Sequence, residues 1–103
     1  MKQMNQRDAI HFITTRGEFK ASALSGKIEE YAPHSGRLDN DEIPKLIEAF
    51  KHFNVYVVYS YGTPIAWHTE ADGWYVVAQK FSVTTSKHQN YVRRAIADSE
   101  VMI

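Results

Sequence analysis

Cysteine is absent from the 103-residue chain, which excludes disulfides, thiolate nucleophiles and sulfur-rich zinc sites. An excess of charge of either sign is absent too, because twelve Lys and Arg balance twelve Asp and Glu. A general duplex binder usually carries a strong basic excess and a DNA mimic an acidic one, so only a local charged patch stays open. The chain also lacks an apolar run of ~20 residues and a signal-peptide core, so we expect a soluble intracellular protein without membrane partners.

Catalytic and metal-binding motifs are missing as well. His68 and Glu70 match the H-x-E half of a zinc deaminase signature, but the other half, P-C-x-x-C, needs cysteine. The five histidines show neither H-x-x-x-H nor H-x-H spacing, and the chain has no G-x-S-x-G elbow, P-loop or G-x-G-x-x-G motif. We therefore predict that the protein is not an enzyme and uses no metal or cofactor.

Short periodic segments indicate an α+β fold in a single domain over residues 1–103. Helices are predicted from Asn5 to near Gly17, at 41–52 and from Lys87 to about Asp98. The apolar face of the second helix is predicted to hold Ile43, Leu46, Ile47 and Phe50. Extended segments are predicted at 18–31, with a turn at Ser25-Gly26, and at 53–60, 63–68 and 73–82. We expect an antiparallel sheet of three to five strands, with the C-terminal helix and two further helices packed on one face.

The register of the hairpin at Gly62 is open between two alternatives that differ in loop length. A two-residue loop, Tyr61-Gly62, groups these residues on one face: Tyr56, Val58, Ile65 and Trp67. A three-residue loop with a bulge at Gly62 groups a second set: Val55, Val57, Ile65 and Trp67. We favour the second alternative because its grouping is more typical of a core face.

The segment SVTTSKHQ at 82–89 is a candidate anion-binding position. Hydroxyl side chains lead into a predicted helix N-terminus, where free N–H groups and the helix dipole attract anions, and cationic donors follow. The candidate residues are Thr84, Thr85, Ser86, Lys87 and His88, joined by Arg93 and Arg94 further along the helix. The alternative, which we favour, is that Ser86 and Gln89 only form an S-x-x-Q capping box and that the arginines lie on a solvated face.

Tyrosines at the hairpin tip are the candidate interaction residues. Tyr61 lies beside Gly62 and is expected to be exposed, with Tyr59 two residues before it. Exposed tyrosine is favoured at protein interfaces, and aromatic rings also stack on unpaired bases. Most large aromatic residues in a domain of this size belong to the core, so this prediction centres on Tyr61.

Two segments resemble a family of small, uncharacterised phage and prophage proteins: YVVYSYGTPIA at 56–66 and FSVTTSKHQNYVRRAI at 81–96. The segment FKASALSG at 19–26 is similar more weakly, and the helix predicted at 41–52 is not part of the pattern. The family has no assigned activity, so the resemblance implies no catalytic residue. It implies an accessory protein of a phage or mobile element in a bacterial cytoplasm.

Three binding functions follow as hypotheses. The first is a non-enzymatic binder that occupies or inhibits a host protein, for example a defence nuclease such as a CRISPR effector, with Tyr61 as contact. The second is a nucleic-acid-binding module that uses Ser86 and Lys87 for phosphates and exposed tyrosines for bases. The third is a nucleotide- or anion-binding protein that uses the same position. A homodimer is open in each case.

Overall fold

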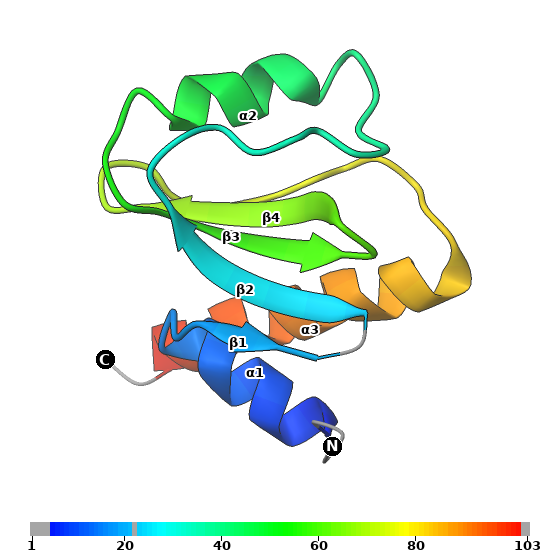
Figure 1. Ribbon diagram of the computed structural model, residues 1–103. Helices are drawn as coiled ribbons and strands as arrows, with labels where there is room; N and C mark the ends of the chain where they lie inside the picture. The colour runs from blue at the N-terminus through cyan, green and yellow to red at the C-terminus, as the bar shows by residue number, and fades with distance from the viewer. Residues whose placement is uncertain (1–4, 22, 102–103) are drawn as a thin grey trace.

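The computed structural model describes residues 5–21 and 23–101 and contains one antiparallel five-stranded sheet with three helices (Figure 1). The strands lie side by side in chain order, from β1 to β5. The elements are α1 (Gln6–Thr14), β1 (Phe19–Lys20), β2 (Leu24–Glu29), α2 (Ile43–Ala49), β3 (Val55–Ser60), β4 (Thr63–Thr69), β5 (Gly73–Val76) and α3 (Val83–Val101). The predicted α+β class, with a C-terminal helix and two further helices on an antiparallel sheet, is confirmed.

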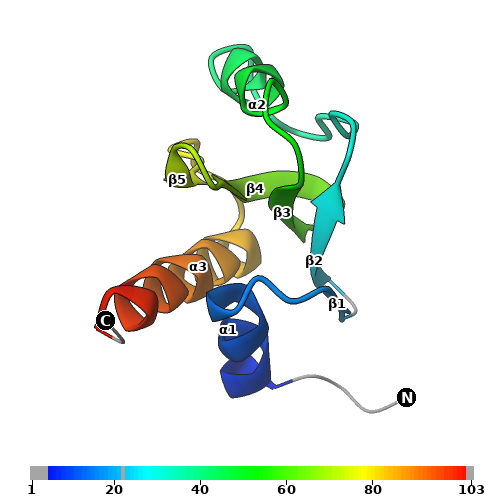
Figure 2. The same ribbon diagram turned by 90° about the vertical axis from the view of Figure 1, so that its left-hand side faces the viewer.

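The helices cover both faces of the sheet, so the prediction that all three lie on one face is wrong. Figure 2 shows α2 on one side of the strands and α1 with α3 on the other. The reason lies in β3, where four successive residues are buried: Val55, Tyr56, Val57 and Val58. A strand that is apolar on both sides needs cover on both faces. Two separate apolar clusters result, one centred on Ile13, Tyr56 and Val92 and the other on Leu46, Val57 and Trp67.

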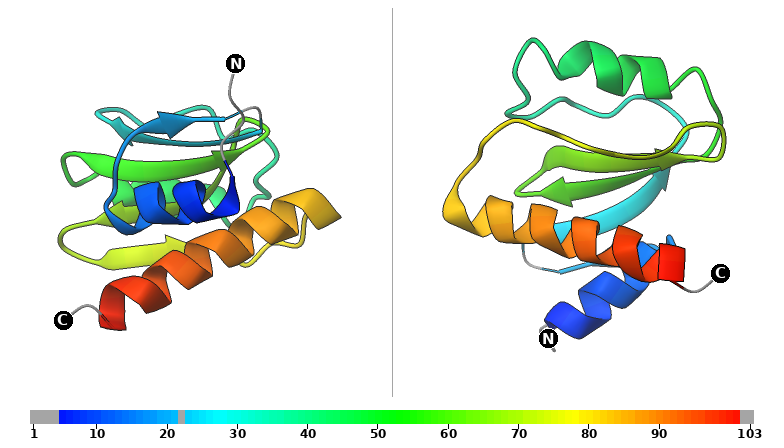
Figure 3. Two further views of the ribbon diagram at one scale, coloured as in Figure 1. Left: turned by 90° about the horizontal axis from the view of Figure 1, so that it is seen from below. Right: turned by 180° about the vertical axis from the view of Figure 1, so that it is seen from behind.

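Helix α1 begins where the sequence predicts. The Asn5 side chain accepts a hydrogen bond from the Asp8 N–H at 2.9 Å, the usual geometry of an N-terminal cap. The helix turns Ala9 and Ile13 inward, and it lies beside α3 in both views of Figure 3. The Tyr56 hydroxyl then donates to the Gly17 carbonyl at 2.7 Å, which fixes the chain after α1 to the centre of the sheet.

The β3–β4 hairpin has the loop of one predicted register, but both predicted groupings are wrong, because Ile65 and Trp67 lie on opposite faces of the sheet. Ser60 pairs with Thr63, so the loop has the two residues of the less favoured alternative. The register then shifts between Val58 and Tyr59, which leaves Ile65 as a bulge residue. Because of this bulge, Trp67 lies opposite Val57 on the α2 face, whereas Ile65 packs in the cluster under α1 and α3.

The turn of the first hairpin lies earlier in the sequence than predicted. Ser25 and Gly26 lie inside β2 rather than in a turn, and Gly26 is required there because a Cβ would meet the Tyr56 hydroxyl at 2.1 Å. Strand β1 pairs only two residues with β2. Beyond it, a Glu18 carboxylate oxygen accepts the Ile28 N–H at 2.9 Å at the open edge of β2.

Two other boundaries differ from prediction. The last strand ends at Val76 instead of continuing to residue 82. Helix α2 has seven residues and buries Leu46 and Ala49. The prediction that Ile47 faces inward is wrong, because Ile47 is 59% exposed. The buried spacing is i, i+3, which a short helix satisfies with a narrow stripe.

Candidate polyanion-binding groove

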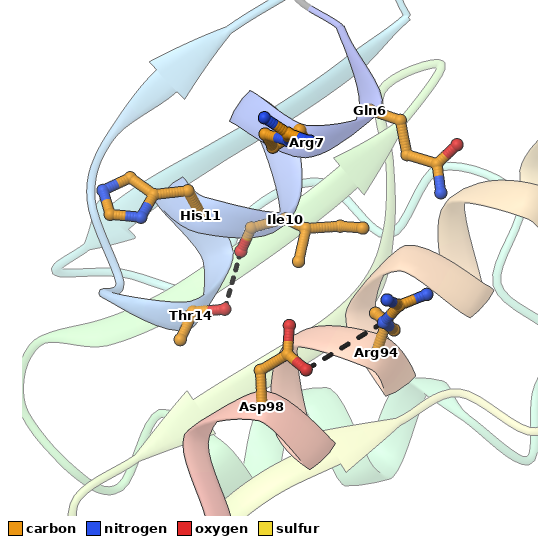
Figure 4. Close-up of a pocket in the computed structure, with 7 residues that line it drawn as sticks. All are labelled: Gln6, Arg7, Ile10, His11, Thr14, Arg94 and Asp98. Carbon is orange, nitrogen blue, oxygen red and sulfur yellow. Dashed lines mark hydrogen bonds and ion pairs between the residues drawn. The ribbon is translucent and has the colours of Figure 1, made fainter. Parts of the chain in front are cut away.

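Helices α1 and α3 enclose two hollows on the molecular surface, with volumes of about 460 and 620 Å³. Gln6 and Arg94 line both hollows, so the two form one continuous depression, called here the α1–α3 groove. The first hollow adds Arg7, Ile10, His11, Thr14 and Asp98, and the second adds Lys87, Asn90, Tyr91 and Arg93. Figure 4 shows the side chains of α1 on one side of the first hollow and Arg94 and Asp98 of α3 on the other.

Cationic side chains dominate the groove. Four of its residues are Arg or Lys, His11 adds an imidazole, and Asp98 is the carboxylate among them. Arg94 Nε lies 3.9 Å from Asp98 Oδ1, but these side chains are 69% and 49% exposed, so the ion pair is weak in water. The guanidinium groups therefore keep their capacity to bind an anion in bidentate geometry.

The balanced net charge of the chain hides an uneven distribution. Eight of the twelve carboxylates lie between Glu29 and Asp72, a segment that carries three of the twelve Lys and Arg side chains. The remaining nine Lys and Arg lie in the flanking segments that include α1 and α3, against four carboxylates. Four of these nine cations line the α1–α3 groove with one carboxylate, Asp98, and they form the local basic surface that the composition left open.

The structure divides the predicted anion-binding residues into two groups. Lys87, Arg93 and Arg94 all line the groove, and Thr84 is exposed at the start of α3. Thr85 and His88 are buried, and Ser86 is half-buried. The sequence also missed Gln6, Arg7 and His11, which reach the groove from α1. Their only signal was the spacing of Arg7 and His11, which puts both on one helix face.

The predicted Ser86–Gln89 capping box is wrong, because α3 begins at Val83. Ser82 is the cap: its hydroxyl accepts the Thr85 N–H at 3.3 Å, and its carbonyl accepts the Ser86 N–H at 2.9 Å. The Gln89 side chain is buried and donates to the Val77 carbonyl at 2.9 Å. Residues 82–86 offer four capping-type side chains, Ser82, Thr84, Thr85 and Ser86, so the sequence leaves the start of α3 ambiguous.

A buried chain of polar groups joins the hairpin to α3. Ser60 Oγ lies 2.7 Å from His88 Nδ1 and 3.0 Å from Thr85 Oγ1, which in turn lies 3.3 Å from the Ser82 hydroxyl. Burial lowers the pKa of His88, so the neutral imidazole is favoured. A serine–histidine pair can form a nucleophile, but Ser60 is 1% exposed and held by Thr85, so its hydroxyl does not face a substrate. These buried polar contacts fix the hairpin tip on α3.

Tyr61 occupies the hairpin tip in an unusual backbone conformation. Its φ is +50° and that of Gly62 is +78°, as in the two-residue turn that favours Asn-Gly. The Tyr61 residue is 59% exposed, and its ring centroid lies 6.2 Å from that of His88. Tyr59 packs with the cluster under α2, and its hydroxyl donates to the Glu29 carboxylate. The structure therefore does not bring Tyr59 and Tyr61 to one surface.

Residues 26–100 match the model of a family described as a family of unknown function (DUF8033), and the chain belongs to this family. The match covers the sheet from β2 onward, α2 and nearly all of α3, and begins after α1. No curated protein and no solved structure matches the chain. In the described residues, no helix combines the length and the apolar character that crossing a membrane requires.

Proposed function

We propose that the protein acts without catalysis by binding nucleic acid, with its phosphates in the α1–α3 groove. The observation that carries this proposal is that Arg7, Lys87, Arg93 and Arg94, from two helices, line the two adjacent hollows of the α1–α3 groove in a chain with no net charge. Phosphate contacts by Lys and Arg supply most of the sequence-independent affinity of nucleic-acid binders. The resemblance of 56–66 and 81–96 to phage and prophage proteins supports a role as a phage or mobile-element accessory protein in the bacterial cytoplasm.

The number of cations sets the expected salt dependence. Each neutralised phosphate contributes a slope of about −0.9 for duplex DNA, or about −0.7 for a single strand, to log K against log salt. Four groove cations therefore predict a total slope of roughly −3. Affinity in the micromolar range at low salt is expected to disappear near physiological salt.

Fluorescence anisotropy with labelled DNA and RNA tests the proposal. We expect Arg94→Ala to weaken binding several-fold, and Asp98→Asn to strengthen it, because the second change removes a carboxylate that competes with phosphate. Both side chains are exposed, so neither change should alter the melting temperature. Lys51→Ala is the matched control, since Lys51 is 70% exposed and lies on the α2 side. Absence of binding at 20 mM salt, or an equal loss in the control, contradicts the proposal.

A protein partner is the second candidate function, and the α2 side carries the observation that favours it. Tyr31, Ile47 and Phe53 are large apolar residues that are 81%, 59% and 91% exposed, in the segment that is rich in carboxylates. An apolar surface with acidic neighbours is complementary to the basic substrate channel of a nuclease. Such a host protein, including a defence nuclease, is the partner that this face fits.

Capture of a host protein by the tagged chain tests the second candidate. Phe53→Ser is expected to abolish capture, whereas Arg94→Ala is expected to leave it intact. Phe53 follows α2 and Arg94 belongs to α3, and these two helices lie on opposite sides of the sheet (Figure 2). A Tyr61→Ala variant separates the α2 side from the hairpin tip as the contact. If Phe53→Ser captures the same protein as the unchanged chain, the α2 side is not the interface.

A further inference from the structure

A row of three rings runs from the hairpin tip into the α1–α3 groove. The His88 ring centroid lies 6.2 Å from that of Tyr61 and 5.8 Å from that of Tyr91. Tyr91 lines the second hollow of the groove, beside Lys87 and Asn90. The exposed ring at the tip is therefore linked to Tyr91 of the groove through the buried His88 ring, on the helical turn that also carries Lys87.

The position of Tyr61 is costly in conformational terms and is held firmly. A bulky residue with positive φ is uncommon, because its Cβ crowds the following carbonyl. The Tyr61 N–H donates to the Ala23 carbonyl at 2.8 Å, so the turn is tied to the neighbouring loop. His88, which the Ser60 hydroxyl orients, supports the Tyr61 ring. The tip thus presents a preorganised aromatic ring, which loses little freedom when a ligand stacks on it.

From this arrangement we infer that the groove takes single-stranded nucleic acid, with a base stacked on Tyr61 and the adjoining phosphates on Lys87, Arg93 and Arg94. This inference rests on the proposed function and names its substrate class. A base exposes its face to an aromatic side chain only when it is unpaired, because duplex bases are already stacked on their neighbours. Lys87 and Arg94 are seven residues apart on α3, a rise of about 10 Å, so the cations follow the backbone over more than one nucleotide.

The side chain amides of the groove suit the same ligand. Asn90 and Gln6 carry both donors and acceptors, and the Asn90 carbonyl oxygen already accepts from Arg93 Nη1 at 3.1 Å. An unpaired base offers its Watson–Crick edge to such groups, whereas in a duplex base pairing occupies that edge. Stacking tolerates any base, so we expect little sequence preference.

The substitution Tyr61→Asn gives a test in which loss of folding cannot imitate loss of binding. Asparagine is favoured in this turn beside glycine, so the variant should melt at a higher temperature than the unchanged protein. It lacks the ring, so its affinity for a labelled 12-nucleotide single strand should fall about tenfold, within the range that base stacking supplies. Its slope of log K against log salt should not change, because every cation is kept. Tyr31→Asn, at the other exposed tyrosine, is the matched control and should bind normally.

The outcomes separate this inference from the proposed function. If Tyr61→Asn binds the single strand as tightly as the unchanged protein, or if a duplex of the same length binds equally well, the single-strand assignment is wrong and the groove still binds nucleic acid. If neither nucleic acid binds at 20 mM salt, the proposed function fails. If Tyr61→Asn loses a captured protein but keeps nucleic-acid affinity, the tip is a protein contact and the inference is overturned.

Discussion

The two sides of the sheet are attached by different kinds of interaction. On one side, α1 and α3 pack on the strands and on each other through apolar side chains, among them Ile13 and Val92, which are fully buried. On the other side, α2 has seven residues, and the loop before it is held by hydrogen bonds between side chains and backbone. Both sides have an apolar cluster, so the comparison is between a side held mainly by apolar area and a side on which directed polar contacts also fasten a loop.

The polar contacts on the α2 side reach across the sequence. The Arg37 N–H donates to Thr63 Oγ1 at 3.0 Å, and the Gln79 amide accepts from the Asp39 N–H at 2.8 Å and donates to the Arg37 carbonyl at 2.9 Å. Together they fasten the loop to β4 and to the segment after β5. Each is worth about 1 kcal/mol, so the loop depends on several acting together.

Glu42 is the centre of this polar attachment. It is 4% exposed and accepts hydrogen bonds from the Tyr75 hydroxyl at 2.6 Å and the Ala78 N–H at 3.2 Å. Burial and the bond to Glu42 raise the pKa of Tyr75, which keeps its hydroxyl a donor. A buried polar group that loses its hydrogen-bond partners lowers stability strongly, so the stability of the α2 side should respond to single polar substitutions. The stability of the α1–α3 side should respond mainly to substitutions that change the volume of a buried side chain.

The largest expected effect comes from paired cavities, one on each side. Ile13→Ala and Leu46→Ala each remove a large side chain that is nearly or fully buried, at a cost of about 3 kcal/mol. We expect Ile13→Ala to lower hydrogen-exchange protection throughout the sheet, and Leu46→Ala to lower it mainly in residues 30–54, because Leu46 packs that segment on the cluster under α2. Equal loss over the whole chain in both variants would remove the distinction between the two sides.

A polar change at Glu42 is expected to have the next largest effect. Glu42→Gln keeps the size of the side chain but replaces a charged acceptor by a neutral one, and we expect a loss of about 2 kcal/mol in urea unfolding. Glu48→Gln is the control, because Glu48 is 65% exposed and pairs only with Lys51. If the two variants lose the same small amount, Glu42 does not hold the α2 side in place.

The smallest effect is a dependence on pH from the α1–α3 side. Burial lowers the pKa of His88, and burial followed by the Arg16 charge lowers that of His68. The unfolded chain, with histidine pKa values of about 6.5, therefore takes up protons first as the pH falls. The unfolding free energy should be constant above pH 7 and decrease below about pH 6.5.

Thermal melts between pH 5 and 8 measure this dependence. His88→Asn and His68→Asn should each flatten the decrease below about pH 6.5, and the double variant should flatten it most. An unchanged slope in the double variant would assign the pH dependence to other groups.

Local patterns predicted those parts of the fold that depend on neighbouring residues. The Asn5 cap of α1 and the two-residue turn at Tyr61-Gly62 were among the alternatives that the sequence offered, and Pro64 lies next to the bulge, where proline is tolerated in a strand. Pro64 indicates a strand start or a bulge but does not show that the bulge puts Ile65 and Trp67 on opposite faces of the sheet. The sequence also could not predict which face of the sheet α2 covers, because both faces of β3 are apolar.

The sequence predicted the α3 residues of the groove but not its α1 residues. Lys87, Arg93 and Arg94 share one helix, so their proximity follows from helical spacing. Arg7 and His11 join them only because α1 packs against α3 more than seventy residues later in the chain, a contact that no local spacing reveals. The buried contact of Ser60 with His88 is of the same long-range kind.

The Glu18 carboxylate at the edge of the sheet has a consequence for how copies of the chain meet. On the edge that faces away from β3, β1 pairs with Ser25 and Gly26 of β2 but not with Lys27–Glu29, and Ile28 is 43% exposed. An apolar residue beside an open N–H is the combination that recruits strands from other molecules and seeds aggregation. Because Glu18 occupies the Ile28 N–H with a charged group, a second chain must displace it before it can extend the sheet. The Glu18 carboxylate thereby disfavours amyloid-like addition of strands at this edge.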